Sequence, residues 1–169
     1  SSGGIGLAIA KAFLAEGCSV AINGRNDSLL NSLAEENVRF YPVVGDVSNA
    51  DEAIDVVSRS VTLMGGLDVI VCNVGSGASV KPGAESYIEW QRVFGKNFFS
   101  ATNIIEAGVS HLEESKGTIV CISSICGCEI IPGAPLTYSV AKAALNAYVK
   151  GISRPLGDMG VRINAVAPG

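Results

Sequence analysis

Tyr138 and Lys142 lie four residues apart and carry side chains that are suited to proton transfer. Residues at this spacing project from one face of a helix, and residues 136–157 have a helical pattern. A phenol is a poor proton carrier at neutral pH, but a neighbouring ammonium group stabilises its phenolate form. The phenol can then give a proton to a carbonyl oxygen or take one from an alcohol. Because this spacing is common on helix surfaces, the pair alone does not establish an active site.

Ser124 supplies a third polar group at the same expected cleft. It follows residues 117–123, whose apolar character predicts a strand. Ligands of open α/β sheets bind beyond the carboxyl ends of the strands. A serine hydroxyl at that edge can hold a substrate oxygen while negative charge develops on it.

Glycines at the start of the chain indicate a phosphate-binding turn. Gly3, Gly4 and Gly6 open a helix that is expected over residues 4–16. Glycines let the backbone approach a phosphate, and a helix N-terminus presents unpaired N–H groups. The full G-x-G-x-x-G spacing is absent, since Ile9 stands at the third position. The pattern therefore fits two interpretations, a cofactor-binding turn and a flexible glycine-rich terminus.

The residues after the apolar segment 18–23 bear on the choice of dinucleotide. Related folds often place Asp or Glu at this point to bind the ribose hydroxyls of NAD. Here the sequence reads Asn23-Gly24-Arg25-Asn26, with no acid. A guanidinium group pairs well with phosphate, so Arg25 favours NADP(H). An ordinary solvated arginine is the alternative.

Helical and apolar extended patterns alternate along the whole chain. Apolar strands separated by helices indicate a parallel sheet covered on both faces. The predicted fold class is α/β, a three-layer, doubly wound parallel sheet in one domain, residues 1–169. The expected strands are 18–23, 38–44, 67–73, 117–123 and 161–165; the expected helices are 4–16, 28–36, one ending near 64, one from about 87 to 112, and 136–157.

Two capping signals locate helix starts. Asp27 is expected to cap the helix over 28–36. Ser48 with Asp51 forms a capping-box pattern for the helix that ends near residue 64. The buried stripe of that helix is expected to consist of Ile54, Val57, Val61 and Met64.

Composition excludes several classes of protein. With 48% apolar and 17% charged residues, the chain is long enough for one packed domain and is not disordered. The net charge of −4 suggests no basic face for nucleic acid, and no run of roughly 18 apolar residues predicts a membrane span. Five cysteines and a single histidine argue against a disulfide framework and against a metal site. These features favour a reducing, cytoplasmic setting.

The two ends of the chain carry an expectation of their own. The sequence begins in the glycine turn and stops at Ala167-Pro168-Gly169, where a strand would pass into a loop. We therefore expect a first strand, central in the sheet, and a C-terminal part to lie outside these residues. Without that strand its neighbours would have unpaired edge groups, so the polypeptide 1–169 alone is expected to be unstable and inactive.

Taken together, these features resemble the short-chain dehydrogenase/reductase family over nearly the whole chain. Residues 1–6 look like the end of the family's T-G-x-x-x-G-x-G turn, and residues 72–75 look like its N-N-A-G motif. Residues 123–127 fit its serine motif, and residues 138–142 are its Y-x-x-x-K motif. Residues 161–169 resemble its closing strand and P-G turn. Each motif alone is weak, but all occur in the right order at compatible spacing.

The resemblance implies that residues 1–169 form one partial NAD(P)-binding domain with a Rossmann-like fold. It also implies hydride transfer between a nicotinamide and a carbonyl carbon. Tyr138 would be the acid/base, and Lys142 would stabilise its phenolate and bind the nicotinamide ribose. Ser124 would polarise the carbonyl, and Asn97 would hold a water in the proton relay. The implied cofactor-binding residues are Ser2, Gly4, Ile5, Gly6, Arg25, Asp46, Val47, Asn73, Gly75, Tyr138, Lys142, Pro168 and Gly169.

The leading functional prediction is an NADP(H)-dependent carbonyl reductase or alcohol dehydrogenase, with NAD as the alternative cofactor. Its class includes enzymes for 3-oxoacyl thioesters, sugars and steroid-like alcohols. Loops 76–85 and 126–136 would flank the substrate, and the apolar second loop favours a neutral, fairly hydrophobic molecule. The resemblance also implies a homodimer or homotetramer. A non-catalytic dinucleotide sensor or scaffold on the same fold is the rival function.

Overall fold

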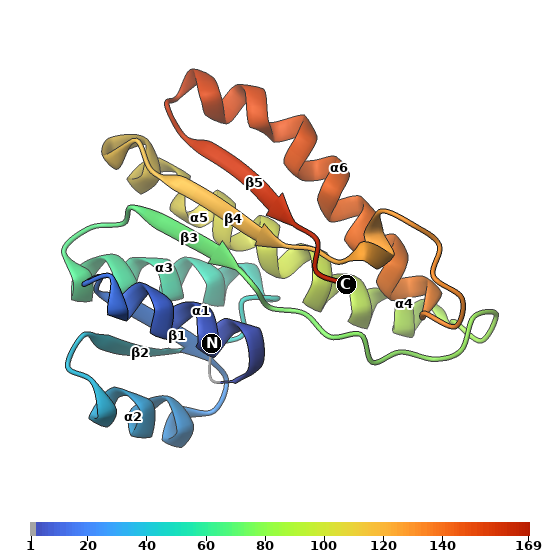
Figure 1. Cartoon of the computed structure of the whole chain (residues 1–169), viewed down its shortest axis with the longest axis horizontal. Helices are drawn as coiled ribbons and strands as arrows, with labels where there is room; N and C mark the ends of the chain where they lie inside the picture. Colours follow the sequence, from blue (N-terminus) through green and yellow to red (C-terminus); the bar gives the residue numbers. More distant parts are fainter. Residues whose placement is uncertain (1–2) are drawn as a thin grey trace.

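Parallel strands and connecting helices alternate through the computed structural model, which describes residues 3–169 (Figure 1). The strands are β1 (Val20–Gly24), β2 (Phe40–Val44), β3 (Val69–Cys72), β4 (Thr118–Ile122) and β5 (Arg162–Val166). The helices are α1 (Gly4–Ala15), α2 (Asp27–Glu36), α3 (Ala50–Met64), α4 (Tyr87–Phe94), α5 (Ser100–Ser115) and α6 (Leu136–Asp158). A π-helical turn, η1 (Gly95–Phe99), joins α4 to α5, and a 3-10 turn, η2 (Ile125–Gly127), follows β4. The order and type of the expected elements are confirmed with one exception: the long helix expected from about 87 to 112 is divided by η1 into α4 and α5.

The strands form two parallel groups. β1 pairs with β2 in register from Val20 opposite Phe40, while β4 pairs with β3 on one side and with β5 on the other. Helices connect the successive parallel strands, as such connections require. The fold is thus the expected α/β, Rossmann-like arrangement. Pro42 is tolerated within β2 because β2 lies at the edge of its group.

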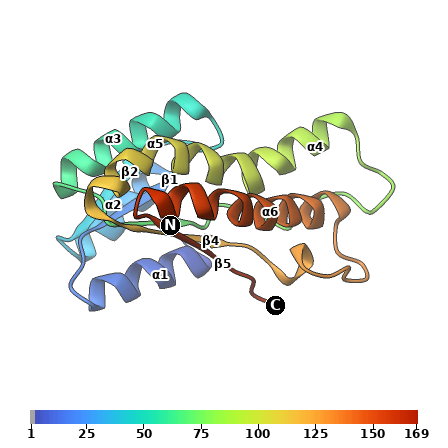
Figure 2. The same ribbon diagram turned by 90° about the horizontal axis from the view of Figure 1, so that it is seen from above.

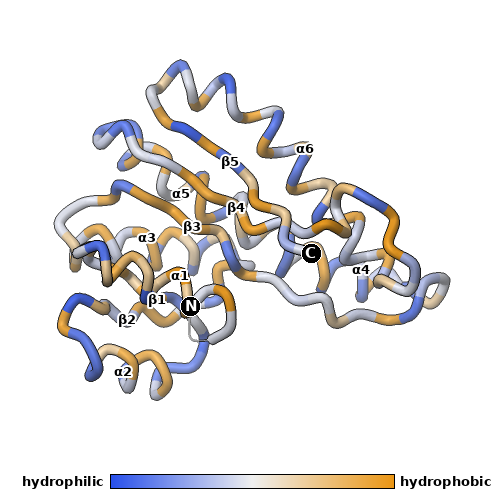
Figure 3. The backbone as a smooth tube through the Cα atoms, viewed as in Figure 1, coloured by the Kyte–Doolittle hydropathy of each residue, from blue (hydrophilic) through white to orange (hydrophobic). Residues whose placement is uncertain are grey.

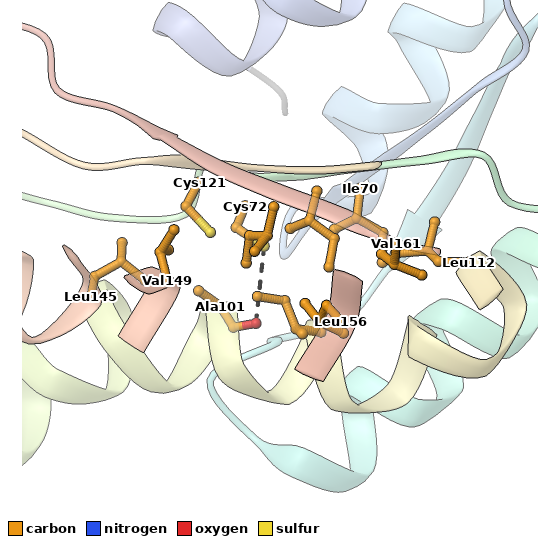
Figure 4. Packing of buried hydrophobic residues seen from close by; sticks show 12 residues of the cluster. Ile70, Cys72, Ala101, Leu112, Cys121, Leu145, Val149, Leu156 and Val161 are labelled. Carbon is orange, nitrogen blue, oxygen red and sulfur yellow. Dashed lines mark hydrogen bonds between the residues drawn. The ribbon is translucent and has the colours of Figure 1, made fainter. Parts of the chain in front are cut away.

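The helices lie on both faces of the strands, in three layers (Figure 2). On one face of β1 and β2, side chains of α1 and α2 such as Leu14 and Leu30 form an apolar cluster, and α3 packs on the other face. Helices α5 and α6 cover one face of β3, β4 and β5 with the largest cluster, part of which is drawn in Figure 4. Apolar residues accordingly follow β3 and β4 in Figure 3. This core fixes the carboxyl ends of these strands beside α6.

A cavity separates the two groups of strands. It has a volume of about 840 Å³ and is lined by the facing edges of β1 and β3 together with side chains of α1, α3 and α5. Within residues 3–169, neither of these facing edges pairs with another strand. The gap lies at the place where the sequence analysis expects a further, central strand.

We expect the polypeptide 1–169, expressed alone, to unfold without a sharp cooperative transition. Each unpaired backbone group along the two edges costs about 1–3 kcal/mol when it is withdrawn from water, and otherwise the gap must fill with water. Guanidinium unfolding of this polypeptide, followed by circular dichroism, measures this. A single steep transition would contradict the expectation.

The helix caps differ from those expected. Asn26, not Asp27, caps α2, because its side chain accepts a hydrogen bond from the Leu29 N–H at 3.0 Å. Asn49, not Ser48, caps α3. The Ser48 hydroxyl instead donates to Asp46 Oδ1 at 2.6 Å, so it is not available to the helix.

The buried stripe of α3 is also displaced from the expected one. The buried residues are Ala53, Val56, Val57 and Ser60, and Ile54 is 59% exposed. Both sets have helical spacing and share only Val57. The expectation was wrong because it followed the largest apolar side chains, whereas small residues lie against the sheet; the Ser60 hydroxyl is satisfied by Val56 O at 2.7 Å.

Candidate functional site

Ser124 lies immediately beyond the carboxyl end of β4. Its side chain is buried, and its Oγ accepts a hydrogen bond from the Cys126 N–H at 3.2 Å, which caps the turn η2. Among residues 3–169, no acceptor takes the hydroxyl proton of Ser124. The hydroxyl is therefore held in place as an acceptor and keeps its proton for a ligand.

Lys142 and Tyr138 project from the same face of α6. Lys142 Nζ lies 5.9 Å from the centroid of the Tyr138 ring and donates a hydrogen bond to Ile122 O at 2.7 Å. The lysine is only 3% exposed. Burial lowers the pKa of Lys142 from its ordinary value, while the thiols of Cys121 and Cys72 act in the opposite direction. The amine thus ties α6 to the end of β4, two residues before Ser124.

The turn η2 packs directly on α6 at Lys142. A Cβ atom at Gly127 would lie 2.7 Å from the carbonyl carbon of Lys142 and 2.9 Å from its oxygen. Only glycine fits this contact without a shift of the backbone. Asn146 Nδ2 also donates to Gly127 O at 3.1 Å. These contacts bring the segments that carry Ser124 and Lys142 against each other.

Asn97 is buried in the π-helical turn η1 and holds the loop after β3. Its Oδ1 accepts from the Ser76 N–H at 2.9 Å, and its Nδ2 donates to Ser76 O at 3.2 Å and Val93 O at 3.0 Å. A Cβ atom at Gly75 would lie 2.8 Å from Asn97 Oδ1 and 3.3 Å from Lys142 Nζ. Asn97, Gly75 and Lys142 therefore converge. Both amide protons of Asn97 are donated within the protein. Its side chain can therefore bind a water only by accepting a hydrogen bond at the second lone pair of Oδ1.

The N-terminus of α1 carries the expected glycine turn. Gly3 caps the helix without a side-chain hydrogen bond, and Gly4 has a φ of 54°, a left-handed conformation that glycine adopts readily. Ile5 is exposed and Gly6 is buried. Because no side chain caps the first turn, its N–H groups can receive an anion. Ser2, expected at this site, lies outside the described residues.

Arg25 and Asp46 meet beyond the ends of β1 and β2. Arg25 Nη1 lies 3.4 Å from Asp46 Oδ2, and both side chains are partly exposed. Hydrogen bonds from Ser48, the side-chain bond first, lower the pKa of the Asp46 carboxyl, with a smaller contribution from Arg25. Val47 is buried, and its carbonyl accepts from Asn103 Nδ2 at 3.1 Å. The groups expected to bind the 2′-phosphate and the adenine thus adjoin.

The end of the chain returns to the serine segment. Pro168 O accepts a hydrogen bond from the Ile125 N–H at 2.9 Å, and Val166 O accepts one from the Ser123 N–H at 2.7 Å. Pro168 thereby lies beside η2. Asn73, at the end of β3, lines the cavity between β1 and β3.

Four polar residues that the sequence analysis did not single out join the loop after β3 to α4 and α6. They are Ser79, Glu89, Arg92 and Thr137. The one available signal was position, since Thr137 directly precedes Tyr138.

Other kinds of site are absent from residues 3–169. No group of three or more His, Cys, Asp or Glu side chains is placed to hold a metal ion there. None of the helices in the described part of the chain has the length and apolar character needed to cross a membrane. All five cysteines are unpaired thiols.

Comparisons with known proteins show the family of the chain. The family model described as short chain dehydrogenase matches residues 1–169. An uncharacterized oxidoreductase of Staphylococcus aureus strain MW2 is 30% identical over 98% of this chain and 73% of its own length. A glucose 1-dehydrogenase of Gluconobacter oxydans is 35% identical over the whole of this chain and 66% of its own length.

Solved structures show the same likeness. A short-chain dehydrogenase/reductase from Caenorhabditis elegans, crystallised with cofactor, superposes with a TM-score of 0.93 at 28% identity. This chain covers 66% of the length of that protein. A short-chain dehydrogenase from Streptomyces avermitilis superposes with a TM-score of 0.91 at 26% identity, and this chain covers 62% of its length. The chain thus spans about two thirds of the length of these relatives. On the family match and the shared fold, it belongs to the short-chain dehydrogenase/reductase family of oxidoreductases.

Proposed function

We propose that the protein is an NADP(H)-dependent oxidoreductase that interconverts a carbonyl compound and a secondary alcohol. The observation that carries this proposal is the position of Lys142. Its buried amine lies 5.9 Å from the Tyr138 ring centroid and binds Ile122 O, two residues before Ser124. A phenol, an amine and a serine hydroxyl gathered at the carboxyl edge of a sheet are suited to proton transfer to a substrate oxygen.

The residues at this edge fit a dinucleotide cofactor. The uncapped N-terminus of α1 can receive its pyrophosphate, and Arg25 can pair with a 2′-phosphate. When bound, the cofactor supplies or accepts the hydride. Tyr138 would move the proton at the substrate oxygen, Lys142 would stabilise the phenolate, and Ser124 would donate its hydroxyl proton to that oxygen. Asn97 would hold Gly75 and Ser76 in place, and its relay role through a water remains a prediction.

The loops around this site favour a neutral, fairly hydrophobic substrate. Ile130 is 97% exposed, and Leu136 and Val80 are also exposed. Val80 and Ile130 stand on the two loops that flank Tyr138, and Leu136 is the first residue of α6. A substrate that covers them gains about 25 cal/mol for each Å² of apolar surface removed from water. The glucose dehydrogenase relative acts on a polar sugar, so we expect the two proteins to differ in these loops.

Turnover of a panel of carbonyl compounds tests this function. NADPH and NADH are each mixed with the intact protein and with 3-oxoacyl thioesters, aldoses or apolar ketones, and the loss of cofactor absorbance is recorded. We expect oxidation of NADPH with the apolar ketones or thioesters. Binding of NADPH without any turnover would instead favour the rival function, a dinucleotide sensor.

The Arg25→Asp variant should bind NADPH less tightly by on the order of 10- to 100-fold and NADH almost normally. This range corresponds to the loss of one or two hydrogen bonds to a charged group. The substituted carboxylate would also repel the 2′-phosphate. Fluorescence titration with the two cofactors gives both dissociation constants.

The matched control for this variant is Arg154→Asp, which makes the same charge change at an exposed position on α6. It should leave both dissociation constants unchanged. Equal losses for NADPH and NADH in the Arg25 variant would show that Arg25 does not bind the 2′-phosphate.

A subunit interface is proposed for the face formed by α4 and η1. Trp90, Phe94, Phe98 and Phe99 make successive ring contacts along it, and Phe99 remains 46% exposed. Tyr87 and Ile88 on α4 are 75% exposed. Large exposed apolar residues of this kind are typical of protein interfaces, so we expect a homo-oligomer.

A further inference from the structure

We propose that Thr137, Ser79, Glu89 and Arg92 form a positioning relay that fixes the first turn of α6, and with it Tyr138, relative to the substrate loop. The expected effect of the relay on kcat rests on the proposed function. The relay joins α6 to the loop after β3 and to α4, which follows that loop; Ser79 and Thr137 are 58 positions apart in the sequence. None of its members needs to touch the substrate.

The direction of the hydrogen bonds follows from the chemistry of the groups. Ser79 Oγ lies 2.7 Å from Glu89 Oε1 and 2.6 Å from Thr137 Oγ1. A carboxylate can only accept, so Ser79 must donate its single proton to Glu89. Thr137 must then donate its own proton to Ser79. The chain of bonds therefore runs from Thr137 through Ser79 to Glu89.

Arg92 anchors the far end of this chain. Its Nε lies 2.8 Å from Glu89 Oε2, its Nη2 lies 2.6 Å from Glu89 Oε1, and Nη2 also donates to Ala78 O at 2.9 Å. The hydrogen bonds from Arg92 and Ser79 lower the pKa of Glu89 to about 2. The carboxylate is therefore ionised at neutral pH, and two neighbouring residues of the loop, Ala78 and Ser79, are held to α4.

The first turn of α6 depends on this anchor because it lacks a cap of its own. The residue at the cap position is Pro135, which makes no side-chain hydrogen bond to the helix. Thr137 is fully buried, at 0% exposure, and its hydroxyl bonds to Ser79 rather than to its own helix. Tyr138 is the next residue. Motion of the Thr137 backbone would therefore displace Tyr138, whose ring lies 5.9 Å from Lys142 Nζ.

The relay also couples substrate contact to the phenol. Ser76 is held by Asn97, and Ala78 and Ser79 are held by α4, so the loop is fixed at two points next to the site. A substrate that presses on this loop acts on Tyr138 through Ser79 and Thr137. We therefore expect loss of the relay to reduce kcat rather than cofactor affinity.

The test compares Thr137→Val, which removes the donor at nearly constant volume, with Thr137→Ser, which keeps it. The Val variant should lower kcat about 3- to 10-fold, the equivalent of one hydrogen bond, with the NADPH dissociation constant unchanged. The Ser variant should restore kcat. Thr62→Val is the matched control, because the Thr62 hydroxyl bonds only to Ser58 O on the exposed side of α3.

A double-mutant cycle with Ser79→Ala tests whether the residues act as a unit. If they do, Thr137→Val combined with Ser79→Ala lowers kcat no further than the larger single effect. The proposal would be overturned if the two effects on kcat multiplied in the double mutant. It would also be overturned if Thr137→Ser failed to restore kcat, or if Thr137→Val changed only KM.

Hydrogen exchange separates this proposal from the proposed function. In Thr137→Val, exchange should rise together in residues 76–86 and in the first turn of α6, and it should stay unchanged in Thr62→Val. If the protein turned over no carbonyl compound, the proposed function would be refuted. The hydrogen-exchange result would still decide whether the relay joins the loop to α6. Exchange that rises in neither segment would overturn the relay.

Discussion

Replacing Tyr138 with phenylalanine is expected to lower kcat by roughly 100- to 10,000-fold, the usual contribution of a general acid/base. The aromatic ring remains, so the packing near Lys142 is kept and only the hydroxyl is lost. The NADPH dissociation constant should change little, because Arg25 and the N-terminus of α1 are untouched. Steady-state rates from cofactor absorbance and a fluorescence titration of NADPH measure the two quantities on the intact protein.

Tyr148→Phe is the matched control for this result. Tyr148 lies on the same helix and packs edge-on against Phe98, with ring centroids 5.9 Å apart. Its hydroxyl makes no hydrogen bond within residues 3–169, so its removal should leave kcat unchanged. Turnover that persists in Tyr138→Phe would show that another group moves the proton, and equal losses in the two variants would point to a packing effect.

The fold was predictable because its signals are local. Apolar segments such as residues 117–123 become strands wherever helices can cover them, and this pattern recurs in order along the chain. The break at η1 was not predictable, because residues 95–99 continue the helical pattern of their neighbours. In the structure this turn contains the buried Asn97, whose side chain bonds to the loop after β3.

The position of Lys142 beside the segment that carries Ser124 was also predictable, from the rule that the carboxyl ends of parallel strands share one edge. The caps were not, because Asn and Ser cap helices equally well. Ser48 was engaged by Asp46, a partner that only the folded backbone brings near.

Contacts between distant residues were the part that sequence patterns could not supply. Ser79 and Thr137 are separated by 58 positions, and both belong to residue types that are common in loops and helices. Arg25 and Asp46 were assigned to different parts of one cofactor, yet their direct contact was not foreseen. Such pairs depend on loop conformation, which the periodicity of the elements leaves open.

Replacing Lys142 with methionine is expected to lower kcat by roughly 100- to 10,000-fold as well, since the phenolate of Tyr138 loses its nearest cation. Unlike Tyr138→Phe, it should also weaken NADPH binding, by about 10-fold, if the amine binds the nicotinamide ribose as the family resemblance implies. The two variants are thereby distinguishable by titration alone. Lys150→Met, at an exposed position two turns further along α6, is the matched control for both measurements.

The pH dependence of stability gives a second result for Lys142. Burial lowers its pKa in the folded protein below the ordinary 10.5, so the unfolded chain binds more protons between the folded-state pKa and 10.5. The free energy of unfolding should therefore rise as the pH increases through that interval. This gain in stability is complete above 10.5 and is lost as the pH falls through the folded-state pKa. Guanidinium unfolding of the intact protein at a series of alkaline pH values should show this rise in Lys150→Met and a smaller one in Lys142→Met. The same rise in both variants would mean that Lys142 keeps an ordinary pKa, which would contradict the burial of its amine beside Tyr138 on which the proposal depends.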